Sequence, residues 1–406
     1  MKIQHIVRVG RRLLSAAVTL AAGWLLLRSQ LPDSFTLAPG EDLELANMPY
    51  LAPMADFGAH TVQQSGAESE TLALFGLIPI KTVHTTFAET TTVTVCGTPF
   101  GIKMFADGAM VVGFTDIYTD QGWRNPGKEA GLRMGDILVS MGNIHTTGNS
   151  QVQQAVEQAQ GEGITITYSR DGQQQTTTIT PVRDAGSGDW RIGVWVRDSS
   201  AGIGTLTFVE KNTGVYGGLG HSISDADTGE SISLLSGEVV SVEITGYKVG
   251  QPGQPGELRG MFAGNTMGDI LLNGTTGVYG HIRSFPQGME MPVANKQQVE
   301  KGKAVILTTI DGSGPHAYEV EIEQAKLAGS EPNRDLLVHI TDPQLLQSTG
   351  GIVQGMSGSP IIQNGRLVGA VTHVLVNDPT RGYGIFAENM LATARSVEEK
   401  WQKQAA

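Results

Sequence analysis

The sequence contains a single cysteine, Cys96, among 406 residues. One cysteine excludes an intramolecular disulfide and a zinc site built from several cysteines. Aromatic residues make up only 6%, and no long run of lysine and arginine marks a nucleic-acid-binding surface. The histidines are scattered and no H-E-x-x-H pattern occurs, so we expect neither a metal nor an organic cofactor.

The remaining composition describes a folded, mainly β protein. Hydrophobic residues make up 40% and charged residues 17%, a balance that can bury cores in two or three domains. The 53 glycines, together with many Val, Ile and Thr, favour short strands joined by tight turns. The formal net charge of −12 would repel anionic lipid, so any membrane contact needs a dedicated segment.

The N-terminus supplies such a segment. An apolar run from Leu13 to Leu27 follows four basic residues, which are Lys2, Arg8, Arg11 and Arg12. This order is typical of a secretory segment or a short signal-anchor, with the basic end kept in the cytoplasm. We therefore expect residues 1–28 to anchor the chain in a membrane and the rest to lie outside the cytoplasm. The segment Leu51–Ala59 contains small residues and could be a cleavage site, so the question whether the anchor is removed stays open.

Composition divides the rest of the chain into three parts. Residues 29–104 begin with a stretch rich in Pro, Gly, Ala and acidic residues, up to about residue 70, which predicts a linker. The more apolar Leu72–Val83 predicts a small β-unit behind it. Residues 105–185 alternate strand and helix patterns, whereas residues 186–406 contain many short strand patterns and one final helix after Phe386.

Residues 105–185 resemble a bacterial PDZ domain. The resemblance rests on KEAGLRMGDILVSMGN, which is followed by a helix with Val152, Ala155, Val156 and Ala159 on one face. PDZ domains bind an extended peptide at a sheet edge beside a helix. We expect this groove along the apolar strand Val111, Val112, Gly113 and Phe114. The alternative is a small α+β domain that binds no ligand.

The strand patterns of residues 186–406 indicate a sandwich or closed barrels. One short repeat, TGVYG, occurs at Thr213–Gly217 and again at Thr276–Gly280. The spacing is compatible with two similar barrel halves, although shared turn chemistry explains it equally well.

A glycine-flanked serine turn carries the clearest chemical signal. In Gly355-Met356-Ser357-Gly358-Ser359-Pro360, the glycines allow positive φ angles and a close approach to substrate. The N–H groups of Gly355 and Ser357 can then form an oxyanion hole, while the Ser357 hydroxyl acts as a nucleophile. Ser359 is a rival nucleophile, and an ordinary Gly/Ser turn without catalytic function is the alternative.

A serine nucleophile needs a base, and nine histidines are available. His221 lies in the glycine-rich segment GGLGHSISDADTG, where small neighbours would leave its ring accessible. His281 follows the second TGVYG, and His373 follows the serine turn on a strand. The residues alone leave the choice among these three open.

From Ala201 onward the chain resembles the stage IV sporulation protein B serine peptidases. The resemblance rests on AGIGTLTF, GGLGHSISDADTG, the long segment from Thr341 to Gly384, and LFGLIPIKTV upstream. It implies a chymotrypsin-like peptidase domain of two six-stranded barrels, preceded by the PDZ domain and the anchor. It also implies a triad of His221, Asp342 and Ser357. Because Asp342 precedes Ser357 by only 15 residues, three other acids, Asp225, Asp227 and Asp269, stay as alternatives.

The resemblance further implies a role in sporulation signalling. Members of that family pass from the forespore through its inner membrane, cut themselves, and cut a membrane-associated regulator of an intramembrane metalloprotease, which then activates a sigma factor. The expected partners are therefore protein substrates, including the chain itself, a peptide for the PDZ domain, and the membrane. Two alternatives are a non-catalytic PDZ scaffold and a general quality-control protease of the cell envelope.

Overall fold

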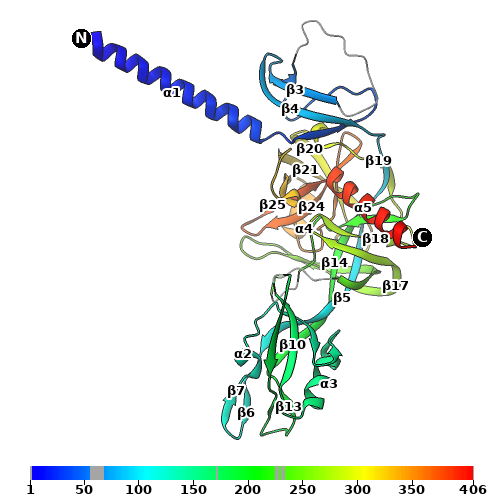
Figure 1. The fold of residues 1–406 in the computed structure, drawn as a ribbon. Helices are drawn as coiled ribbons and strands as arrows, with labels where there is room; N and C mark the ends of the chain where they lie inside the picture. Colours follow the sequence, from blue (N-terminus) through cyan, green and yellow to red (C-terminus); the bar gives the residue numbers. More distant parts are fainter. Residues whose placement is uncertain (1, 55–67, 171, 225–227, 230–233, 406) are drawn as a thin grey trace.

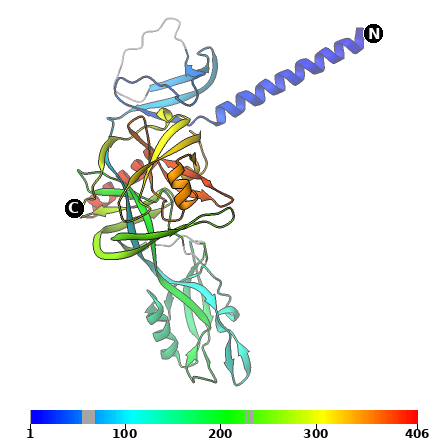
Figure 2. The same cartoon turned by 180° about the vertical axis from the view of Figure 1, so that it is seen from behind.

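Two β-barrels form the body of the protein, with a small sheet at one end and an α+β unit at the other (Figure 1). The computed structural model of the chain describes residues 2–54, 68–170, 172–224, 228–229 and 234–405. The view from behind shows the same elongated order of parts (Figure 2). The fold is mainly β, as the composition predicts.

Helix α1 (Lys2–Ser29) projects away from the body (Figures 1 and 2). Its C-terminal end is attached to the small sheet, because the Trp24 indole N–H donates to the carbonyl of Pro79 at 2.9 Å. Within the described part of the chain, no helix reaches the length and apolarity that a membrane span requires. The anchor over residues 1–28 therefore stays a prediction.

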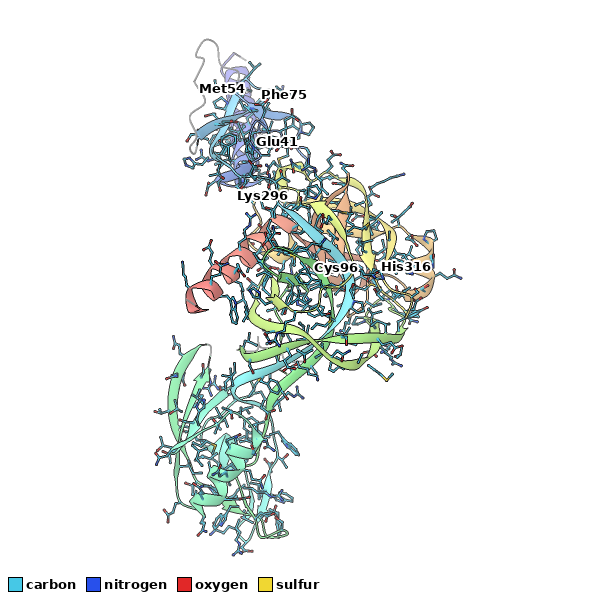
Figure 3. All side chains as sticks on the ribbon, turned by 90° about the vertical axis from the view of Figure 1, so that its right-hand side faces the viewer. Glu41, Met54, Phe75, Cys96, Lys296 and His316 are labelled. Carbon is cyan, nitrogen blue, oxygen red and sulfur yellow. The ribbon has the colours of Figure 1, made fainter. Side chains whose placement is uncertain are left out.

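The small sheet has the order β1-β4-β3-β2. Its strands are β1 (Ser34–Leu37), β2 (Leu51–Pro53), β3 (Glu68–Leu74) and β4 (Ile78–Phe87). The prediction of a linker up to about residue 70 is wrong for part of its length, because Phe35 and Leu51 are buried in a core shared with the second barrel. Strands β1 and β2 are too short to show a repeating hydrophobic pattern, so the sequence did not predict them. Glu41 and Lys296 mark the junction of the two parts (Figure 3).

The first barrel is a closed ring of six strands in the order β5-β14-β15-β18-β17-β16, and β16 pairs back with β5. The strands are β5 (Thr92–Phe114), β14 (Val194–Val209), β15 (Val215–Gly218), β16 (Leu234–Lys248), β17 (Glu257–Gly274) and β18 (Gly277–Ile282). The two TGVYG copies end in β15 and β18, which pair with each other. The repeat therefore lies within one barrel and does not mark two equivalent halves.

The second barrel is also closed and six-stranded, in the order β20-β21-β22-β25-β24-β23. The strands are β20 (Gly302–Thr308), β21 (His316–Ala325), β22 (Leu336–Ile340), β23 (Pro360–Gln363), β24 (Arg366–Leu375) and β25 (Asp378–Phe386). Around them lie β19 (Met289–Pro292), η1 (Lys296–Gln298), η2 (Pro332–Arg334) and α4 (Pro343–Thr349). The predicted final helix is α5 (Ala387–Ala405), whose Met390 and Ala394 pack in a core with residues of both barrels.

The α+β unit is inserted between β5 and β14 of the first barrel. Its sheet has the order β11-β10-β8-β5-β14, so the two long barrel strands also form part of this sheet. The other elements are β6 (Ile117–Thr119), β7 (Gly122–Arg124), α2 (Pro126–Glu129), β8 (Ile137–Met141), β9 (Ile144–His145), α3 (Asn149–Ala159), β10 (Ile164–Arg170), β11 (Gln173–Ile179), β12 (Val182–Arg183) and β13 (Trp190–Arg191). Val152, Ala155 and Val156 of α3 are buried, as their spacing predicts.

The insertion corrects two predicted domain boundaries. The division between residues 104 and 105 falls inside β5, and Pro99 to Phe105 pair with β14 in the barrel. The division between residues 185 and 186 precedes β13 (Trp190–Arg191), which still belongs to the inserted unit. Sequence patterns could not show this, because each strand is continuous through both parts. The two parts therefore share two unbroken strands (Figure 3).

Candidate active site

A cleft of about 770 Å³ between the barrels contains both His221 and Ser357. Its walls come from the middle of β14, the loop after β15, the turn before β23, and the strand β24. The two residues are 136 positions apart in the sequence, and the pairing of two barrels brings them to one site. Cys96 is not a competing nucleophile, because it is buried and its burial raises the pKa of the thiol to about 12.

The serine turn has the backbone that its glycines predict. Gly355 and Gly358 have φ angles of 98° and 94°, in the region that favours glycine. A Cβ on Gly358 would lie only 2.0 Å from the carbonyl oxygen of Thr205, so no other residue fits there without a shift. The Ser357 hydroxyl lines the cleft and donates to the carbonyl of Thr372 at 2.6 Å.

The first barrel holds this turn from one side. Thr205 of β14 donates from its N–H to the carbonyl of Ser357 at 2.9 Å and from its hydroxyl to the carbonyl of Gly355 at 2.9 Å. The hydroxyl of Thr207 donates to the carbonyl of Gly358 at 2.7 Å. From the other barrel, Val371 accepts from the N–H of Gly358 at 2.7 Å. Four hydrogen bonds from two barrels therefore fix the position of the nucleophile.

The two predicted oxyanion donors are available. Among the hydrogen bonds of the described residues, the N–H groups of Gly355 and Ser357 have no acceptor. The carbonyls of Gly355 and Ser357 accept hydrogen bonds from Thr205, which holds both residues in place. Their N–H groups are therefore positioned in advance to bind an oxyanion. The rival serine is unsuitable, because Ser359 is fully buried and its hydroxyl donates to the carbonyl of Met356 at 2.6 Å.

His221 lies in the loop after β15. Its Nδ1 is 2.7 Å from the carbonyl oxygen of Ser222. Because a carbonyl oxygen only accepts, this contact places the proton on Nδ1 and leaves Nε2 free to accept one. Burial lowers the pKa of His221 below its ordinary value, although the Ser222 carbonyl opposes the shift. The ring is therefore neutral at neutral pH, as a general base must be.

The imidazole of His373 stacks against that of His221, with ring centroids 4.5 Å apart and planes 34° apart. Burial, followed by the nearby His221 and Arg334, lowers the pKa of His373 to about 4. The sequence indicated only that His373 could line the cleft or lie in the core. Its strand position after the serine turn was visible, but its contact with His221 was not.

Asn273 is a residue that sequence reasoning missed. Its side chain accepts from the N–H of Ile223 at 2.7 Å and donates to the carbonyl of Ile223 at 3.0 Å. Both bonds hold the backbone two residues after His221. In the sequence Asn273 precedes Gly274 at the end of β17, so it gave only a turn signal.

Asp342, the acid implied by the resemblance, is not brought to this cleft. It is the N-cap of α4, where its carboxylate accepts from the N–H groups of Gln344 and Leu345 at 2.9 and 3.0 Å. A third N–H, from Glu319, lies 3.3 Å away. Of the alternative acids, Asp269 pairs with Arg283. Asp225 and Asp227 lie outside the described residues. The structure thus joins His221 with Ser357 and leaves Asp342 at a helix terminus.

The structure also corrects the predicted peptide groove. Val111, Val112, Gly113 and Phe114 belong to β5, which pairs with β14 along this stretch. On the other side, Val111 exchanges hydrogen bonds with the segment before β8, and it is fully buried. A continuous apolar run is typical of an inner strand, which explains the error. The strand that runs beside α3 is β14, where Val194 and Val196 pack against the core of the unit.

Comparisons with known proteins identify a peptidase family. The family model described as SpoIVB peptidase S55 matches residues 188–391, half of the chain. No curated protein matches the chain. Among solved structures, it is similar to the PDZ domain of an SdrC-like protein from Listeria monocytogenes, with 16% identity over 22% of this chain and 87% of that one, at a TM-score of 0.18.

Two solved proteases are similar over larger parts of the chain. The inactive form of the Rv3671c protease from M. tuberculosis has 14% identity over 48% of this chain and 84% of that one, at a TM-score of 0.27. The HtrA-type protease AlgW with a decapeptide has 8% identity over 75% of this chain and 65% of that one, at a TM-score of 0.32. These superpositions are distant, so the assignment of the fold rests on the strand pairings themselves.

Proposed function

The chain belongs to the SpoIVB peptidase S55 family and is a serine endopeptidase, and from this we propose that it is a signalling peptidase of sporulation. In this role it cuts itself and a membrane-associated regulator, and the second cut releases an intramembrane protease that activates a sigma factor. The observation that carries the catalytic part is the cleft in which His221 faces the same space as the fixed Ser357 turn.

The chemistry follows from the protonation state of His221. Nε2 of its neutral ring accepts the proton of Ser357 while the serine oxygen attacks a peptide carbonyl. The Ser222 carbonyl, which accepts from Nδ1, keeps the ring in the required tautomer and stabilises the imidazolium that forms. Before attack, the Ser357 hydroxyl must turn from Thr372 toward the imidazole, so the described arrangement is a resting one.

The main chain of the serine turn then stabilises the tetrahedral intermediate. The N–H groups of Gly355 and Ser357 donate to the oxyanion, and the imidazolium gives its proton to the leaving amine. Water, deprotonated by His221, releases the acyl-enzyme in the second half of the reaction. All of these steps use groups that line the cleft, and none needs the Asp342 carboxylate.

The chain's own N-terminal part is the proposed self-cleavage target, within residues 29–70. Strands β1 and β2 are hydrogen-bonded into the small sheet, so a cut inside them requires the sheet to open. The segment between them, residues 38–50, contains no strand, and a cut there requires only the release of Leu43, Leu45 and Met48 from the core. N-terminal sequencing of the mature protein locates the cut, and the Ser357→Ala variant should leave the N-terminus intact.

Membrane attachment through residues 1–28 is part of the proposal. It is supported by the basic residues before the apolar run and by exposed aliphatic side chains on α1, which include Leu14, Val18 and Leu25. In this arrangement the catalytic part faces the space between the forespore membranes until self-cleavage releases it. Fractionation of sporulating cells, before and after the cut, tests both the attachment and the release.

Labelling with a serine-directed fluorophosphonate tests the catalytic assignment. Wild-type protein should take up the label on Ser357, and Ser357→Ala should take up none. Ser359→Ala is the matched control, because it removes the neighbouring hydroxyl that is buried. Label on Ser359, or on Ser357→Ala protein, would contradict the assignment. Extensive degradation of casein would instead favour a quality-control protease over a signalling peptidase.

A further inference from the structure

The edge of β14 is open over most of its length. One side of the strand pairs with β5 from Val194 to Val209, whereas the other pairs with β15 only from Leu206 to Val209. Apart from Arg197, residues 194–204 therefore have no strand partner on that side within the described part of the chain. An open edge presents N–H and C=O groups to which an extended peptide can add.

The register shows which groups face outward in the half nearest the active site. Thr205 points away from β5, because its N–H donates to Ser357 and its carbonyl accepts from Leu219. The register with β5 is continuous from Ser199 to Leu206, and strand residues alternate in direction. Three residues of the same parity, Ser199, Ala201 and Ile203, therefore point the same way, and their backbone groups have no partner among the described hydrogen bonds.

This row of free groups ends at the nucleophile. The next outward position after Ile203 is Thr205, whose N–H is bonded to the carbonyl of Ser357. Ser199, Ala201 and Ile203 also line the cleft that contains Ser357. A peptide paired with this edge would thus reach the serine in line with the strand, without a turn.

The other half of the same edge lies beside helix α3. Near the C-terminal end of α3, a Cβ on Gly161 would lie 2.5 Å from the ring of Trp190, just before β14 begins. Near the start of α3, a Cβ on Gly148 would lie 2.3 Å from the Asp198 carboxylate. The edge therefore follows α3 from end to start, which is the helix-and-strand arrangement of a PDZ peptide groove.

A carboxylate site lies where this edge begins. Gly193 has a φ angle of 69°, and among the described hydrogen bonds the N–H groups of Ile192 and Gly193 have no acceptor. Successive N–H groups at such a bend form a concave site for anions, including the C-terminal carboxylate of a peptide.

We propose that one extended substrate occupies both sites at once, with its free C-terminus at Ile192–Gly193 and its scissile bond at Ser357. This inference rests on the proposed function. The ten residues from Val194 to Ile203 span about 30 Å at about 3.3 Å per residue. A separate substrate with a free C-terminus is then cut about ten residues before that end, whereas self-cleavage within residues 29–70 does not use the carboxylate site. The strand bends at Asp198, where β5 has three extra residues opposite.

A randomised library of 20-residue peptides tests the distance, with mass spectrometry of the products from the full-length protein. Half of the library has a free C-terminal carboxylate and half a C-terminal amide. Cuts in the first half should cluster about ten residues from the C-terminus, and amidation should slow cleavage about tenfold and scatter the cuts. Scattered cuts at equal rates in both halves would overturn the proposal.

Fluorophosphonate labelling of the same preparation separates the two levels of failure. If Ser357 is labelled and the cuts are scattered, the peptidase assignment is supported and the proposed distance between the cut and the C-terminus is wrong. If there is neither labelling nor cleavage, both the peptidase assignment and the proposed distance are wrong.

The Ala201→Pro variant removes one outward N–H, and proline is tolerated at strand edges. It should cut the free-acid library less than Ala201→Ser, which keeps the N–H. Equal cleavage by the two variants would contradict pairing along this edge. The comparison of free-acid with amidated peptides uses wild-type protein. It therefore tests the proposal even if Ala201→Pro fails to fold.

Discussion

The two halves of the catalytic cleft are built in different ways. The serine turn is held by four hydrogen bonds from both barrels, three of which come from Thr205 and Thr207. The histidine loop is held mainly by Asn273, and the His221 ring contacts a neighbouring carbonyl and a second imidazole. The nucleophile and the oxyanion donors are therefore pre-organised, whereas among the described residues the contacts of the His221 ring are a carbonyl and an imidazole, and Asp342 is not one of them.

This difference indicates where the reaction is sensitive to substitution. Interactions on the serine side are redundant, so the loss of one should cost little. On the histidine side, the described contacts are one side chain that holds the loop and one carbonyl that orients the ring, so each loss should cost more. The following predictions test this contrast, from the largest expected effect to the smallest.

Removal of the base should have the largest effect. His221→Ala leaves Ser357 without a proton acceptor, and kcat/KM should fall by about 10⁴ or more. The substrate is the peptide that wild-type protein cuts best from the library. His281→Ala is the control, because His281 pairs with Glu398 of α5. If the two variants lose activity equally, His221 is not the base.

Loosening of the histidine loop should come next. Asn273→Ala removes both hydrogen bonds to Ile223, and kcat should fall between about tenfold and hundredfold as the imidazole loses its position. Asn273→Asp keeps the acceptor for the Ile223 N–H and loses the donor, so its kcat should be intermediate. Unchanged kcat in both variants would show that the loop is held by other contacts.

The acid limb of the pH–rate profile reports on the partner of His221. Burial lowers the pKa of this imidazole below its ordinary value of 6.5. Because only the neutral ring accepts a proton, kcat/KM should persist to below pH 6.5 and then fall about tenfold per pH unit. A carboxylate partner would raise the pKa instead. A limb above pH 7 would therefore indicate a carboxylate beside His221 and contradict this expectation.

A smaller effect is expected on the serine side. Thr205→Val removes the hydroxyl that donates to Gly355 but keeps the shape and the N–H bond to Ser357. One lost hydrogen bond is worth about 1 kcal/mol, so kcat should fall about fivefold. Thr205→Ser retains the hydroxyl, so its kcat should fall less than that of Thr205→Val. A larger loss than in Asn273→Ala would reverse the contrast between the two halves.

The serine turn could be predicted from the sequence because its chemistry is local. Glycines at positions 355 and 358 permit positive φ angles, and the turn has the predicted form. The short strands also followed from patterning, which left a sandwich and closed barrels as alternatives. The two six-stranded barrels were implied only by the family resemblance. The serine turn and the short strands depend on residues that are close together in the chain.

The features that the sequence could not predict depend on distant contacts. Thr94 pairs with Val209 across the whole inserted unit, so the continuity of β5 and β14 had no local signal. For the same reason β14, not the more apolar Val111–Phe114, is the strand beside α3. The contact between His373 and His221 and the capping of α4 by Asp342 likewise arise only from the three-dimensional fold.

The central claim is that His221 acts without the Asp342 carboxylate, and its most direct test is kcat/KM of Asp342→Asn, measured against the wild type. Asparagine keeps an N-cap oxygen for Gln344 and Leu345 and removes the charge, so kcat/KM should stay within about threefold. Asp342→Ala loses the cap and should lower the free energy of unfolding by about 1 kcal/mol. A loss of about 10⁴ in Asp342→Asn would contradict this claim, because it would show that this carboxylate orients His221 during catalysis.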